Sequence, residues 1–199
     1  MSIRAPSVNG SGTISRVAAV LLVALAAPVA AREVRGIDVP ESIRVEGHTL
    51  RLNGAGIRRR FFFDIYVIGL YVERPTTDLA AVLAANTPRQ VRIHLVRAVS
   101  AQQMRDAVAE GFRRSAGDAM PGLETRLARL EAMLRAGGPG DVTTLTWIPG
   151  RGTVVTDDGH EIGTIEGKDC ADVVFGVWIG PRPVDDGLAR TLLAGGKTE

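Results

Sequence analysis

Apolar residues recur along the chain with the two periods that distinguish strands from helices. Alternating or continuous runs rich in Val, Ile, Phe and Thr, bounded by turn-forming residues, are typical of strands. The expected strands cover residues 43–45, 49–52, 57–72, 91–97, 142–147, 153–156 and 160–165. The longest of them follows a Gly-Ala-Gly turn, and we expect it to be bulged or broken at Gly69.

Segments with a period near 3.6 predict helices between and after these strands. Thr77 or Asp78 is expected to cap a short helix that ends at Ala85. Ser100 and Gln103 form a capping box that opens a helix running to about residue 114. Further helices are expected at residues 123–135, 168–178 and 187–193.

The order of these elements predicts the fold class. Pro149-Gly150-Arg151-Gly152 and Asp157-Asp158-Gly159 are turn signals that join the last three strands into a β-meander. Strands and helices do not alternate in a βαβ rhythm, so the sheet is expected to be mostly antiparallel. We predict an α+β fold: an open-faced layer of about six or seven strands, covered by helices on one face.

The N-terminal segment has the composition of a secretory signal peptide. Residues 1–16 hold two arginines and no acid, and residues 17–27 are eleven consecutive apolar residues. Small residues up to Ala31 then offer a cleavage site. We therefore expect a signal peptide at residues 1–31, one domain at 32–199, and a periplasmic or secreted protein without a transmembrane segment. An apolar N-terminal helix of the folded domain is the alternative.

Charge and cysteine content exclude some classes of partner and cofactor. The net charge of +2 belongs to the two arginines of the expected signal peptide, so the remaining chain is neutral and lacks the basic surface of a nucleic-acid-binding protein. His48, His94 and His160 do not have the spacing of metal ligands. Cys170 is the only cysteine and is expected to be a small core residue. No metal and no cofactor is predicted.

Residues 54–73, GAGIRRRFFFDIYVIGLYVE, carry a resemblance to a known family. The pattern GAG-x-R, followed by a Phe-rich strand ending in IG-aliphatic-YxE, resembles the chalcone isomerase family. Residues 99–112, VSAQQMRDAVAEGF, are similar to that family's helix opening, and Trp178-Ile179-Gly180 is similar to the end of its last helix motif. The resemblance implies the family's fold. The members of this family include plant flavonoid enzymes, fatty-acid binders and bacterial homologues.

The resemblance carries over few of the isomerases' catalytic residues. The family arginine corresponds to Arg58, which is present. A family threonine corresponds to Tyr66, which keeps only a hydroxyl. The family's tyrosine, asparagine and second threonine correspond to Met104, Gly111 and Val177. This pattern resembles the fatty-acid binders more than the isomerases.

The helical face itself points to the same chemistry. Met104, Val108, Gly111 and Phe112 follow the spacing of one helical face, which then offers no hydrogen-bond donor to a developing oxyanion. The predicted ligand-binding residues are Arg58, Tyr66, Met104, Val108, Gly111, Phe112 and Val177. The predicted function is the binding of a small apolar carboxylate, or of a phenolic ligand, in a cleft between sheet and helices, without catalysis. An intramolecular lyase acting on a chalcone-type enone is one alternative, and a structural domain without a ligand is another.

The sequence does not decide which arginine reaches the cleft. Arg58 and Tyr66 are closer in sequence than their counterparts in the family, so Arg59 or Arg60 could take the place of Arg58. In a continuous strand Asp64 lies on the Tyr66 face, where it could neutralise an arginine. A solvated strand end is the alternative for the whole arginine cluster.

Overall fold

The computed structural model describes Met1 and residues 31–197. Apart from Met1 and Ala31, the expected signal peptide lies outside the described residues. The strands are β1 (Ala31–Val34), β2 (Ile37–Pro40), β3 (Ser42–Val45), β4 (His48–Arg60), β5 (Phe63–Val72), β6 (Arg89–Leu95), β7 (Val142–Ile148), β8 (Gly152–Asp157) and β9 (His160–Ile165). The helices are α1 (Leu79–Ala84), α2 (Ala101–Ala116), α3 (Glu124–Met133), α4 (Lys168–Ile179) and α5 (Asp186–Leu192), with a 3-10 helix at Gly117–Gly122.

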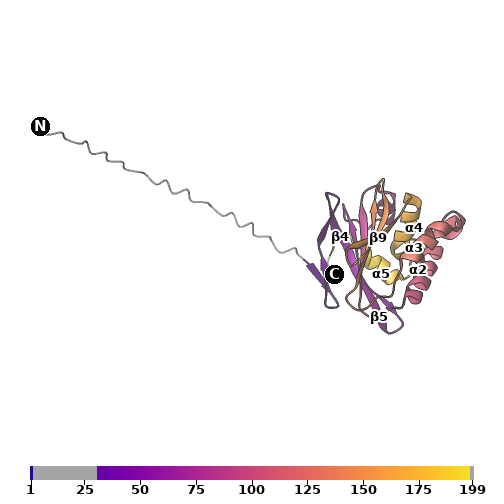
Figure 1. Ribbon diagram of the computed structural model, residues 1–199. Coiled ribbons are helices and arrows are strands. Elements are labelled where there is room, and N and C mark those ends of the chain that lie inside the picture. Colours follow the sequence, from indigo (N-terminus) through magenta and orange to yellow (C-terminus); the bar gives the residue numbers. More distant parts are fainter. Residues whose placement is uncertain (2–30, 198–199) are drawn as a thin grey trace.

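Strands β3 to β9 form one seven-stranded sheet in which neighbours in sequence are also neighbours in space. Every pairing in it is antiparallel. The helices lie together on one face of the sheet, while β1 and β2 form a separate two-stranded sheet on the other side (Figure 1). The arrangement confirms the predicted α+β layered fold.

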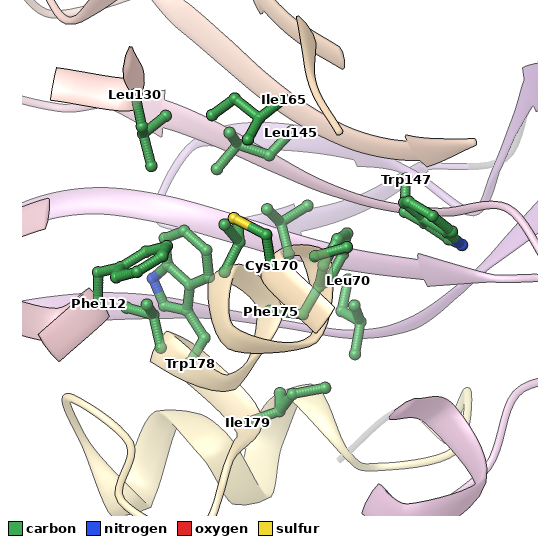
Figure 2. Packing of buried hydrophobic residues seen from close by; sticks show 14 of the residues in the cluster. Leu70, Phe112, Leu130, Leu145, Trp147, Ile165, Cys170, Phe175, Trp178 and Ile179 are labelled. Atoms are coloured by element: carbon green, nitrogen blue, oxygen red, sulfur yellow. The ribbon is translucent and has the colours of Figure 1, made fainter. Parts of the chain in front are cut away.

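The main hydrophobic core lies between the sheet and the helices. Helix α4 is central to it, because eight of its twelve residues are buried. Figure 2 shows Cys170 and Phe175 of α4 between the sheet residues Leu70 and Leu145 and the neighbouring helices. Phe112 of α2 belongs to the same cluster, so α2 and α4 are held to the sheet by a shared apolar layer.

The opposite face of the sheet carries a second apolar cluster that the sequence did not predict. Leu50, Leu52, Val67 and Tyr71 are its fully buried members on β4 and β5. Val39 of β2 packs into it and is 1% exposed, so the small β1–β2 sheet covers part of this face. Among the described residues, all members of both clusters lie between Val34 and Leu193, so a chain beginning at Ala31 contains every core residue that the structure describes.

The prediction of one long strand over residues 57–72 is wrong. The chain reverses at Phe61 and Phe62, and β4 and β5 form an antiparallel hairpin in which Arg60 pairs with Phe63. The expected irregularity at Gly69 is also absent, since Gly69 pairs regularly with Ala55; the register shifts lie at Leu52/Gly54 and Arg58/Arg59. The reversal was missed because phenylalanines occupy the turn, where glycine or asparagine is the usual signal.

The Gly-Ala-Gly motif does not form the expected turn but lies inside β4. A Cβ atom on Gly54 would lie 2.0 Å from the carbonyl oxygen of Thr191 in α5. One on Gly56 would lie 2.8 Å from Leu188 Cδ1. The two glycines therefore allow α5 to lie directly on the strand, and this contact fixes the position of the residues that precede α5.

Candidate functional site

A cavity of about 510 Å³ lies between the sheet and helices α2, α3 and α4. Its walls include aliphatic side chains from both layers, among them Ile93, Leu95, Leu130, Leu145, Val155 and Val174. The volume lies within the range of ligand pockets, which begins at roughly 300 Å³. Several of the wall residues are also core residues, so the cavity is an extension of the main apolar cluster.

All seven residues predicted from the sequence line this cavity. They are Arg58 of β4, Tyr66 of β5, Met104, Val108, Gly111 and Phe112 of α2, and Val177 of α4. The structure therefore brings the predicted set together around one volume.

Arg58 and Tyr66 are adjacent because of the β4–β5 hairpin. Their Cα atoms are directly opposite each other in the register of the two strands. Opposite residues of an antiparallel pair project their side chains from the same face of the sheet. A guanidinium and a phenol thus reach the same part of the cavity wall, although the sequence expectation had placed them on one continuous strand.

The Tyr66 hydroxyl is positioned by Trp178 of α4. Trp178 Nε1 donates a hydrogen bond of 2.9 Å to Tyr66 Oη, and both residues line the cavity. Burial raises the pKa of Tyr66, an effect that the Trp178 hydrogen bond and the nearby Arg58 charge only partly oppose. Tyr66 is therefore a neutral phenol at physiological pH, and its own proton remains available because it donates no hydrogen bond to any described residue.

Arg58 is held by a carboxylate at the start of α5. Arg58 Nη1 lies 3.1 Å from Asp185 Oδ2, and the Arg58 side chain is 24% exposed. The other oxygen, Asp185 Oδ1, accepts a hydrogen bond of 2.9 Å from Leu188 N and caps the helix. Asp185 thus caps α5, orients the guanidinium of Arg58 and offsets part of its charge.

The neighbouring arginines have different surroundings. Arg59 Nε binds Asp64 Oδ1 at 2.9 Å, and Arg35 Nη2 binds Asp64 Oδ2 at 2.6 Å. The hydrogen bond from Arg59 is the main reason why the pKa of Asp64 is lowered. Arg60 lines the cavity together with Arg58, whereas Asp64 and Arg59 are not part of the lining. The expected neutralisation by Asp64 therefore affects Arg59 and Arg35, not Arg58.

Helix α2 borders the cavity with Met104, Val108 and Phe112 and also with Gln103, Glu110 and Arg114, and it has no gap at Gly111. A Cβ atom on Gly111 would lie 2.8 Å from Val177 Cγ1 and 3.3 Å from Val184 Cγ1. The space that an asparagine would need is therefore occupied by valines from α4 and the segment after it. Gly111 allows α2 and α4 to approach closely at the cavity wall.

Trp178 and Asp185 are two residues with polar contacts at this site that were not among the seven predicted from the sequence. Trp178 shares a helical face with Val174, which also lines the cavity. The i, i+4 spacing of Val174 and Trp178 was a sequence signal for this position. No such signal pointed to Asp185, because its contact with Arg58 spans 127 residues.

Neither a metal site nor a membrane-spanning helix is present in the described part of the chain. Among residues 31–197, no group of three His, Cys, Asp or Glu side chains is placed to hold a metal ion. No helix of these residues is long and apolar enough to cross a bilayer.

Comparison with known proteins gives the family. Residues 31–194 match the family described as chalcone isomerase-like. The chain therefore belongs to the chalcone isomerase-like family, as the resemblance of residues 54–73 implied. No curated protein matches the chain in sequence.

A solved structure with the same fold is that of a fatty-acid binding protein from Arabidopsis thaliana. It superposes with a TM-score of 0.66 at 18% sequence identity. The match covers 81% of this chain and 93% of the plant protein. At this level of identity the likeness shows a common fold.

Proposed function

We propose that the protein binds a medium- or long-chain aliphatic carboxylate in the cavity between sheet and helices, without transforming it. The observation that carries this proposal is a mainly apolar cavity of about 510 Å³ in which Arg58 and the neutral phenol of Tyr66 share one wall. An arginine fork binds a carboxylate through charge-assisted hydrogen bonds, and the Tyr66 hydroxyl can donate another. The aliphatic chain would lie against Met104, Val108 and Phe112.

Two further observations support binding over catalysis. The Arabidopsis protein with the same fold is a fatty-acid binding protein. In this chain Met104, Gly111 and Val177 supply no side-chain donor to the cavity, and one missing donor costs on the order of 100-fold or more in the rate of a reaction through an oxyanion. An intramolecular lyase is therefore the less supported alternative.

Isothermal titration calorimetry with carboxylates of several chain lengths tests the proposal. Arg58→Ala should weaken binding by about tenfold or more, because a hydrogen bond to a charged group is worth about 1.5–3 kcal/mol and every 1.4 kcal/mol is a factor of ten. Arg59→Ala is the matched control, since Arg59 binds Asp64 and does not line the cavity.

Two calorimetric results would contradict the proposal. If no carboxylate binds below millimolar concentration, or if Arg58→Ala and Arg59→Ala behave alike, then the cavity does not hold a carboxylate at Arg58. An alcohol of the same chain length should bind more weakly than the acid and should be insensitive to Arg58→Ala.

The location of the protein is a second part of the proposal. Residues 1–31 have the composition of a signal peptide, so the chain would be exported and would begin at Arg32. Arg32 forms a salt bridge of 3.2 Å with Glu41, which cleavage after Ala31 would preserve. N-terminal sequencing of the protein from the cell envelope should read Arg32 first, and a protein beginning at Met1 or Ser2 would contradict export by this route.

A further inference from the structure

Three consecutive phenylalanines are exposed at the end of the β4–β5 hairpin. The exposed fractions are 85% for Phe61, 99% for Phe62 and 57% for Phe63. Apart from Met1, these are all of the exposed large hydrophobic residues in the described part of the chain. Scattered apolar residues on a surface need no explanation, but apolar side chains gathered at one point indicate an interaction site.

The fold does not require phenylalanine at these positions. Phe61 adopts a φ of +55°, a left-handed conformation that glycine adopts freely and that is strained for a bulky residue. Phe61, Phe62 and Phe63 belong to neither core cluster. Phe61 and Phe62, almost fully exposed, thus add little to packing, and Phe61 also disfavours the turn that it forms.

Arginines surround this apolar tip. Arg35, Arg59, Arg60 and Arg97 lie beside it: Arg97 places its guanidinium 4.4 Å from the centre of the Phe63 ring, and Arg35 and Arg59 share the carboxylate of Asp64. Neither Arg60 nor Arg97 forms a salt bridge with any described residue. Of these four guanidinium groups, two share the Asp64 carboxylate and two form no salt bridge with a described residue, although the chain from Arg32 onward is neutral as a whole.

The hairpin tip also borders the cavity. Phe61, Phe63, Arg60 and Arg97 are among the cavity-lining residues. Because Phe61 and Phe63 are more than half exposed, they lie at the rim and not at the base of the cavity. In Figure 1 the β4–β5 hairpin reaches the lower edge of the molecule, near the end of the helical layer.

We infer that this hairpin tip, residues 61–63 with Arg35, Arg59, Arg60 and Arg97 around it, docks the protein on an anionic lipid surface. Aromatic side chains at a protein tip enter the boundary between headgroups and acyl chains, and arginines beside them bind anionic headgroups. Docking in this orientation turns the rim of the cavity toward the bilayer. In this orientation an apolar carboxylate could pass between membrane and cavity with little exposure to water, a consequence that rests on the proposed function.

Cosedimentation with lipid vesicles tests the inference, using the chain from Ala31, which contains every core residue that the structure describes. Phosphatidylcholine vesicles that contain phosphatidylglycerol should bind this chain, and they should bind it more tightly than pure phosphatidylcholine vesicles. The combined variant Phe61→Ser, Phe62→Ser, Phe63→Ser should bind at least tenfold more weakly. Because these side chains are exposed, the variant should keep the circular dichroism spectrum and melting temperature of the parent.

Two arginine variants test the electrostatic part. Arg60→Gln should weaken binding to the anionic vesicles by about fivefold, since each arginine near such a surface strengthens the binding by about that factor. Arg129→Gln is the matched control: Arg129 is exposed on α3 and does not line the cavity. Added salt should weaken the binding of the parent chain.

A tryptophan at the tip gives an independent measurement. The fluorescence of Phe62→Trp should shift to shorter wavelength with anionic vesicles and should be quenched by brominated lipid. Failure of the parent chain to bind either vesicle, or unchanged binding of the serine variant, would overturn the inference. So would self-association of the parent chain that the serine variant abolishes without any vesicle binding, because the tip would then join two copies. Calorimetry with carboxylates contains no lipid surface, so the ligand proposal can succeed or fail independently.

Discussion

At the scale of single residues, the Arg58–Asp185 pair sets the charge available to a ligand. Asp185 binds one nitrogen of the guanidinium at 3.1 Å, while its other oxygen caps α5. A carboxylate ligand would have to share Arg58 with this neighbouring anion. The pair therefore fixes the direction of the arginine at some cost in affinity.

Asp185→Asn separates these two effects. Asparagine caps helices as well as aspartate does, so the hydrogen bond to Leu188 N should survive while the negative charge is lost. Because partly exposed ion pairs are worth about 0.2–1 kcal/mol, carboxylate binding should become up to about fivefold tighter. Calorimetry against the parent chain measures this change. A loss of affinity like that of Arg58→Ala would mean instead that Asp185 is needed to position the guanidinium.

At the scale of elements, local signals predicted most helices and strands but not their contacts. The capping box of Ser100 and Gln103 identified the start of α2, and both of its hydrogen bonds are present. Asp158 and Gly159 correctly marked the turn between β8 and β9. Each of these signals lies within a few residues of the structure that it determines.

The elements that were predicted wrongly either depend on a partner far away in the sequence or lack the usual local signal. The glycines of residues 54–56 suggested a turn, yet they lie in a strand, where the lack of a side chain leaves room for α5. The turn at Phe61 and Phe62 has no local signal at all. At the site, the predicted residues were found through family resemblance and helical periodicity, whereas the Tyr66–Trp178 bond spans 112 residues and could not be predicted from spacing.

At the contact between α2 and α4, the effect of Gly111→Ala on stability is expected to change sign when Val177 is replaced by alanine. Gly111→Ala should raise the helix propensity of α2 by about 1 kcal/mol. In the parent chain, however, the new Cβ would lie 2.8 Å from Val177 Cγ1, and such overpacking costs about 1–3 kcal/mol. The variant should therefore be less stable than the parent by up to about 2 kcal/mol.

The same substitution in a Val177→Ala background should be stabilising or neutral, because the obstructing methyl group is gone. Urea unfolding of the four chains of this cycle gives the coupling free energy. A Gly111→Ala effect that is the same in both backgrounds would show that Val177 does not limit the approach of α2. Val177→Ala alone should be destabilising, since it removes buried methyl groups.

At the scale of the whole molecule, the cavity is continuous with the core that holds the fold together. Phe112, Val177 and Trp178 belong to the main apolar cluster and also line the cavity. A ligand that fills this space adds contacts to the same layer that fixes α2 and α4 on the sheet. Binding should therefore be visible in the stability of the entire domain, which distinguishes a ligand-binding protein from a structural one.

A bound carboxylate is accordingly expected to raise the melting temperature. At a free ligand concentration of about a hundred times Kd, a ligand that binds only the folded state stabilises it by about 2.7 kcal/mol. For a domain of this size, each 1 kcal/mol raises Tm by about 2–4 °C, so the expected shift is about 5–10 °C. Differential scanning calorimetry should show this shift for the acid and a much smaller one for its methyl ester at the same concentration. Equal shifts for acid and ester would mean that the apolar chain alone is recognised, and no shift with either would favour a structural domain whose cavity holds no such ligand.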